Sequence, residues 1–121
     1  MLTLVKRFDE IPFVNKFCIY KLDEPIGDDR YIVSQGEFSD FGLKHQGKKL
    51  IEDLSPYSYE GRFQTLREAY IFVQYAYAHI TAGKYYHQSK MGKTISTEEN
   101  DNFRKNDKAI MEMWNNLPKE K

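Results

Sequence analysis

Cysteine is almost missing from this sequence of 121 residues, since Cys18 is the only one. A single cysteine excludes an intrachain disulfide, and a chain of this length can bury enough surface for one core without such a staple. A lone cysteine is typical of a reducing compartment, so we expect an intracellular, cytoplasmic protein. No run approaches the ~20 apolar residues of a membrane span, and charges interrupt the N-terminus where a signal peptide would be apolar. The sequence therefore predicts no membrane association.

An excess of charge of either sign is also missing, because 18 basic side chains balance 18 acidic ones. Proteins dedicated to nucleic acids usually carry a basic excess, since phosphate contacts supply much of their affinity. Aromatic residues are plentiful by contrast, at 15% of the chain, and buried Phe and Tyr remove large apolar areas from water. This composition predicts a single folded domain over residues 1–121 rather than a disordered chain.

The first half of the chain, residues 1–63, is predicted to be rich in strands. Segment 13–23 has apolar residues at both alternating positions, which indicates a strand buried on both faces at the centre of a sheet. Turn-forming residues then lead into a strand over 30–35, and the two strands predict a β-hairpin. Residues 36–49 contain three glycines and are expected to be irregular or a short hairpin, and 57–63 is a further candidate strand.

The second half is predicted to be helical. Thr65 and Glu68 form a capping box at the start of an amphipathic helix over 64–82, and Gly83 stands where a C-terminal cap is common. A second capping box, from Ser96 to Glu99, begins a helix over 96–117. The predicted fold class is α+β: a small antiparallel sheet in the N-terminal half, packed by one amphipathic helix, with a second helix at the C-terminus.

The order of strands followed by Gly61-Arg62-Phe63-Gln64-Thr65 and a capped helix resembles the β-β-β-α arm-binding domains of phage integrases. The resemblance covers residues 13–81. Those domains present basic residues on the sheet, whereas the matching strands here carry Asp and Glu as often as Lys and Arg. We therefore do not assign the chain to that family.

No motif in the sequence predicts catalysis. Gly92-Lys93-Thr94 is similar to the end of a phosphate-binding P-loop, but His87 stands where that motif needs its first glycine. Cys18 sits among apolar neighbours in a predicted strand, which favours a buried structural thiol over a nucleophile. The three histidines show no metal-ligand spacing. We expect no enzyme, no catalytic residue, no metal and no cofactor.

The connection between the two predicted helices, residues 83–95, is the strongest candidate for a binding site. It is longer than most connections in small domains, it has no acidic residue, and its lysines lie beside aromatic rings. The predicted contact residues are Lys84, Tyr85, Tyr86, His87, Lys90 and Lys93. In the second helix, Met113 and Trp114 are predicted to form an apolar anchor for a partner or for a second copy in a homodimer.

These features favour a small non-enzymatic binding or inhibitor module that acts on another protein, since lysine beside tyrosine suits a protein interface. The alternative is a module that binds nucleic acid or a nucleotide ligand through the same residues. A purely structural interpretation also stands, in which the tyrosines cover the edge of the core and the lysines keep the segment solvated. Residue types with AT-rich codons predominate, which indicates an AT-rich genome such as that of a low-GC bacterium or its phage.

Overall fold

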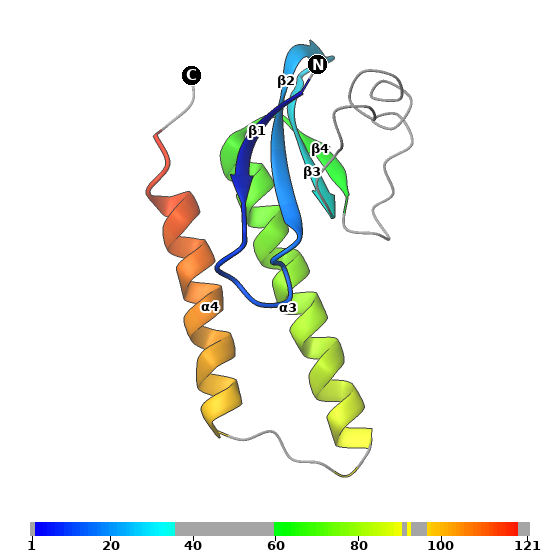
Figure 1. The fold of residues 1–121 in the computed structure, drawn as a ribbon, viewed down its shortest axis with the longest axis vertical. Helices are drawn as coiled ribbons and strands as arrows, with labels where there is room; N and C mark the ends of the chain where they lie inside the picture. The colour runs from blue at the N-terminus through cyan, green and yellow to red at the C-terminus, as the bar shows by residue number, and fades with distance from the viewer. Residues whose placement is uncertain (1, 36–59, 91, 93–96, 119–121) are drawn as a thin grey trace.

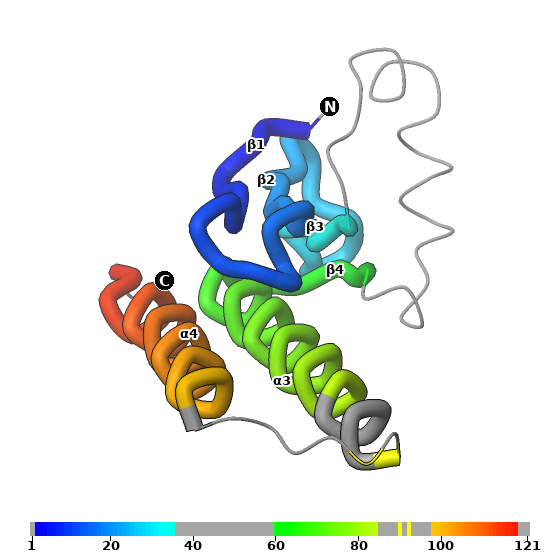
Figure 2. The backbone as a smooth tube through the Cα atoms, turned by 60° about the horizontal axis from the view of Figure 1, so that its bottom comes forward, coloured from blue at the N-terminus to red at the C-terminus, as the bar shows by residue number. Residues whose placement is uncertain are grey.

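The structure is a computed structural model that describes residues 2–35, 60–90, 92 and 97–118. Four strands form an antiparallel sheet in which their spatial order follows the chain, and two helices come after them (Figure 1). The elements are β1 (Leu2–Arg7), β2 (Phe17–Ile26), β3 (Asp29–Gln35), β4 (Gly61–Phe63), α3 (Leu66–Lys90) and α4 (Thr97–Asn115). Figures 1 and 2 show α3 across one face of the sheet and α4 beside α3. The predicted α+β class and its arrangement are confirmed.

Strand β2 is central, as its two apolar faces predict, because it pairs with β1 on one side and β3 on the other. The predicted hairpin joins β2 to β3 through Gly27 and Asp28, and Gly27 has a φ of 61°. A glycine at the first central position is what a two-residue type II′ turn requires. The predicted segment 36–49, the first part of the predicted strand 57–63 and the capping residue Ser96 lie outside the described residues.

Strand β1 is an edge strand that the sequence pattern does not predict. Leu4 pairs with Tyr20 and Lys6 pairs with Ile19, so Val5 is an extra residue that forms a β-bulge. A shift of one residue exchanges the two faces of a strand. The bulge therefore places Lys6 and Phe8, and not Arg7, on the helix-facing side, and this brings Phe8 into the core beneath the sheet.

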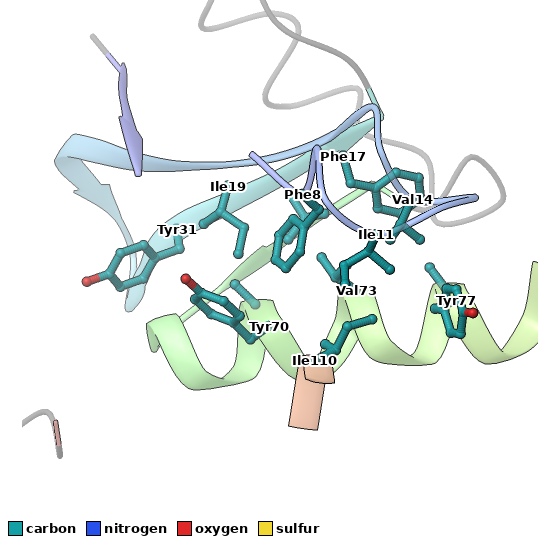
Figure 3. Close-up of a cluster of buried hydrophobic side chains, with 13 residues drawn as sticks. Phe8, Ile11, Val14, Phe17, Ile19, Tyr31, Tyr70, Val73, Tyr77 and Ile110 are labelled. Carbon is teal, nitrogen blue, oxygen red and sulfur yellow. The ribbon is translucent and has the colours of Figure 1, made fainter. Parts of the chain in front are cut away.

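The main core lies between the sheet and α3 (Figure 3). The connection between β1 and β2 supplies three fully buried or nearly buried side chains, Phe8, Ile11 and Val14. The other labelled members come from strands and helices: Phe17, Ile19, Tyr31, Tyr70, Val73, Tyr77 and Ile110. A second cluster, on the opposite face of the sheet, contains Cys18, Tyr20, Leu22 and Ile32. The thiol of Cys18 is buried there, as predicted.

Helix α3 begins as the capping box predicts. The backbone N–H of Glu68 donates a hydrogen bond to Thr65 Oγ1 at 3.1 Å. This bond satisfies one of the N–H groups that the first turn of a helix leaves without an intrahelical acceptor. The carboxylate of Glu68 in the same turn lies at the positive end of the helix dipole.

Removing this cap is expected to lower the stability of the protein modestly. Thr65→Ala should reduce the free energy of unfolding by about 1 kcal/mol, because the N–H of Glu68 loses its acceptor. Thr65→Ser keeps a hydroxyl at the same place and should stay close to the wild type. Urea unfolding followed by circular dichroism measures both changes, and equal stability of Thr65→Ala and Thr65→Ser would contradict the cap.

The predicted end of this helix is wrong, because α3 continues through Gly83 to Lys90. A glycine inside a helix costs only about 1 kcal/mol relative to alanine, so one glycine without a following proline does not end a helix. The glycine that follows the helix in a left-handed conformation is Gly92, with a φ of 71°. The predicted loop over 83–95 is therefore helical from 83 to 90. Within the described residues, neither helix is long and apolar enough to cross a membrane.

Candidate functional site

The structure places the six predicted contact residues on or beyond the last turns of α3. Lys84 is half-buried and Lys90 is exposed, whereas positions 85–87 are described as helix backbone only and Lys93 lies outside the described residues. Successive positions on a helix are about 100° apart around its axis, so positions 84–87 surround the helix and do not share one face. A continuous basic and aromatic loop is therefore not what the chain forms here.

Lys84 belongs instead to a cluster of rings that sequence reasoning missed. Its Nζ lies 5.1 Å from the ring centroid of Phe13 and 5.7 Å from that of Phe103. The rings of Phe13 and Phe103 are 5.7 Å apart, and the ring of Tyr77 lies 6.4 Å from that of Phe13. These distances are typical of cation–π and tilted aromatic contacts. We call Phe13, Tyr77, Phe103 and Lys84 the aromatic–lysine cluster.

Phe13 is the unusual member of this cluster. It has a φ of 70°, a left-handed conformation that is rare for a bulky residue and costs on the order of 1–3 kcal/mol. Phe13 nevertheless remains 39% exposed, so full burial does not offset that cost. The connection between β1 and β2 thus holds an apolar ring at the surface, against α3 and α4, in a backbone conformation that asparagine or glycine would adopt more easily.

Met113 and Trp114, the predicted interface residues, are half-buried and pack against the core. The indole Nε1 of Trp114 donates a hydrogen bond to Gln74 Oε1 at 2.6 Å, and the Arg67 guanidinium lies 4.8 Å from the ring. The structure therefore uses Trp114 to hold α4 on α3 within one chain. Their predicted role as an anchor for another molecule stays a prediction.

Two more polar contacts fix α4 against α3. Gln74 Nε2 donates to Asp107 Oδ1 at 3.2 Å, so one amide side chain joins Trp114 and Asp107. Asn106 Nδ2 donates to the buried hydroxyl of Tyr77 at 3.1 Å. Directional bonds of this kind set the register between two helices more strictly than apolar packing alone.

A groove of about 310 Å³ opens between the two helices. Its walls are Tyr77, Ala78, Thr81 and Ala82 from α3, and Asn100, Phe103, Arg104 and Asp107 from α4. The walls are mostly apolar, and the polar lining residues of α4 are Asn100, Arg104 and Asp107. Thr81 Oγ1 donates a hydrogen bond to the backbone carbonyl of Tyr77 at 2.9 Å. This hydroxyl is therefore bonded within its own helix and not to a side chain that could act as a catalytic base. The groove suits the binding of an apolar group with a polar tip.

The outer face of α3 is a second exposed apolar surface. Its largest side chains are Ile71 and Tyr75, which are 41% and 54% exposed. The ring of Tyr75 lies 6.3 Å from that of Phe72 and 5.2 Å from the imidazole of His79. Metal chemistry has no support from the described ranges, where no three His, Cys, Asp or Glu side chains are placed to share an ion.

These features define a small α+β protein whose sheet is covered by α3 with α4 beside it, with a partly exposed aromatic–lysine cluster and a groove between the helices. Comparison with known protein families, with curated proteins and with solved structures found no match.

Proposed function

We infer that the protein is a non-enzymatic binding module that acts by occupying the surface of another protein, through the aromatic–lysine cluster. The observation that carries this proposal is Phe13, which is 39% exposed and has a left-handed backbone conformation. Strained residues that packing does not repay are concentrated at functional sites. Aromatic residues, Phe included, are also enriched in the cores of protein interfaces.

The charges at this end of the helix pair favour a protein over a nucleic acid as partner. Lys84 and Lys90 lie toward the end of α3, and α4 begins at the same end of the helix pair (Figures 1 and 2). The exposed carboxylates of Glu98 and Asp101 lie in the first turns of α4. A phosphate backbone gains from a surface of one sign. A surface of mixed sign beside the exposed Phe13 suits a protein partner. A lone buried cysteine suits a cytoplasmic setting.

Capture from a lysate of the source organism tests this proposal with matched variants. Phe13→Asn removes the ring but keeps a residue that tolerates positive φ, and Lys84→Gln removes the charge. Leu4→Asn is the control, because Leu4 is as exposed as Phe13 at 38% but lies on β1. The wild type and Leu4→Asn should retain a protein that Phe13→Asn and Lys84→Gln lose. With the purified partner, Phe13→Asn should weaken the dissociation constant by on the order of 10- to 100-fold.

Equal capture by all four chains would overturn the proposal. Capture that disappears after nuclease treatment, and that falls steeply with rising salt, would instead establish the nucleic-acid alternative. Circular dichroism of each variant checks that a lost partner reflects the changed surface and not a lost fold.

A further inference from the structure

The groove between α3 and α4 has the size and the lining of a small-molecule site. Its volume of about 310 Å³ lies at the lower end of the range for ligand pockets. Ala78 and Ala82 are one turn apart on α3, so both lie on the same face of the helix, and their small side chains leave space that larger ones would fill. The ring of Phe103 on α4 adds an apolar wall. An apolar group of modest size can therefore leave water in this groove.

Two opposite charges on α4 line the same groove, Arg104 and Asp107. Residues three apart on a helix are neighbours, and side chains of opposite sign at this spacing commonly pair. In the part of the chain that the structure describes, no ion pair joins these two side chains, and no hydrogen bond engages the exposed guanidinium of Arg104. Asp107 Oδ1 instead accepts a hydrogen bond from Gln74 Nε2 at 3.2 Å, across the contact between the helices. The structure thus holds a cation and an anion at one groove without pairing them.

Both charged groups have hydrogen-bonding capacity left for a ligand. A guanidinium offers five N–H donors, and a carboxylate accepts about four hydrogen bonds, of which one comes from α3 here. The hydroxyl groups of the groove are already engaged. Thr81 Oγ1 donates within its own helix, and the Tyr77 hydroxyl accepts a hydrogen bond from α4 at 3.1 Å. Recognition of a ligand in this groove therefore depends mainly on Arg104 and Asp107.

We propose that this groove binds a free α-amino acid with an apolar side chain. An α-amino acid carries a carboxylate and an ammonium group on one carbon, and these match the guanidinium of Arg104 and the carboxylate of Asp107. The apolar side chain then lies against the wall formed by Ala78, Ala82 and Phe103.

The pair of opposite charges selects a zwitterion over ligands with a single charge. A fatty acid or another apolar carboxylate would gain the guanidinium of Arg104, but it would also meet the carboxylate of Asp107. An apolar amine would meet the reverse conflict. Like charges brought together cost affinity, and binding sites reject wrong ligands in this way. A residue inside a peptide chain has neither of the two charged groups, so the ligand is the free amino acid.

Titration of the purified full chain with L-phenylalanine, followed by NMR, tests the proposal. The methyl resonances of Ala78 and Ala82 should shift with a dissociation constant on the order of 0.1–1 mM, while those of Leu4 on β1 stay in place. Phenylalanine amide lacks the carboxylate, N-acetylphenylalanine lacks the ammonium group, and glycine lacks the apolar side chain. Each of these three compounds should bind at least about 10-fold more weakly than L-phenylalanine.

Variants of α4 test the two charges separately. Arg104→Gln and Asp107→Asn should each weaken the binding of L-phenylalanine by on the order of 10-fold. Asparagine at position 107 keeps an oxygen that can accept from Gln74, so the docking of α4 is retained. Lys105→Gln and Asp101→Asn are the matched controls. They remove the same kinds of charge from exposed positions of α4 that do not line the groove, and they should leave the affinity unchanged.

Three results would overturn this proposal. The first is the absence of any shift of the Ala78 and Ala82 resonances at about 10 mM L-phenylalanine, well above the expected dissociation constant. The second is equal binding of L-phenylalanine and of its amide or N-acetyl derivative. The third is an equal loss of affinity in Arg104→Gln and Lys105→Gln, with circular dichroism showing that both variants are folded.

This titration is independent of the proposed protein contact. It uses the purified chain without any partner, and Phe13 is not a wall of the groove, so Phe13→Asn should still bind L-phenylalanine. The failure of one proposal is therefore distinguishable from the failure of the other.

Discussion

Phe8→Ala is expected to lower the free energy of unfolding by about 4 kcal/mol, the largest effect of any substitution considered for this chain. The Phe8 ring is fully buried, and it meets the ring of Tyr70 edge to face at a centroid distance of 5.4 Å. Alanine leaves a cavity that the surroundings cannot fill, because the backbone of this connection is fixed. The Phe8 N–H donates to the carbonyl of Phe17 at 3.2 Å, and the Phe8 carbonyl accepts from the N–H of Ile11 at 3.0 Å. Urea unfolding followed by circular dichroism measures the loss.

Two companion variants separate the cavity from other causes. Phe8→Leu keeps most of the volume and should cost less than about 2 kcal/mol, and the exposed Leu4→Ala should change stability by less than about 0.5 kcal/mol. A loss below about 1 kcal/mol for Phe8→Ala would contradict the place of Phe8 in the core.

Tyr70 gives an independent readout of the same cavity. Burial, the largest cause, raises the pKa of the Tyr70 phenol, while the Lys6 charge lowers it and the Glu10 charge raises it. Removing the Phe8 ring admits water beside Tyr70, so the pKa of Tyr70 should fall toward its ordinary value. An NMR titration of the Tyr70 ring in folded Phe8→Ala measures this shift. The raised pKa also means that the phenol favours folding below its unfolded pKa and that this contribution is lost as the pH rises through the folded pKa.

The sheet was predictable where apolar residues alternate without interruption and unpredictable where the alternation breaks. Strand β3 and most of β2 follow from the pattern of residues 17–35, but the predicted strand over 13–23 begins four residues too early, because residues 13–16 form turns before β2. Strand β1 does not follow from the pattern, because the bulge at Val5 exchanges the faces of the strand partway along and hides the period of two. The start of α3 was predictable because it depends on a local hydrogen bond. The predicted end at residue 82 was wrong, because glycine is a weak stop signal inside a helix.

The candidate site was less predictable than the fold. Lys84 stood out because of its aromatic neighbours in the sequence, but the rings that it contacts belong to Phe13 and Phe103, far away along the chain. Only the folded structure brings these three residues together, since they come from a loop and two helices. The exposed face of α3 did leave a signal in the sequence, the absence of charge between Glu68 and Lys84, and the sequence-based predictions did not use it.

The attachment of α4 depends on very few buried atoms, which makes it the next point at which a substitution should act strongly. Among the described side chains of α4, Ile110 is the one that is fully buried. It lies in the core cluster with Val73 and Tyr77 (Figure 3). The other contacts of α4 with α3 are partly exposed side chains and hydrogen bonds to Gln74 and Tyr77.

Ile110→Ala should therefore lower the free energy of unfolding by about 3 kcal/mol. Trp114 is the only tryptophan of the chain and lies one turn after Ile110, so its fluorescence reports the docking of α4. The urea transition seen by Trp114 fluorescence should move to lower concentration in Ile110→Ala. Met111→Ala, at a half-buried position of the same helix, should move it much less. Equal shifts of the urea midpoint in the two variants would contradict the anchoring of α4 through Ile110. They would also mean that Ile110 does not hold α4 in the position that forms the groove with α3.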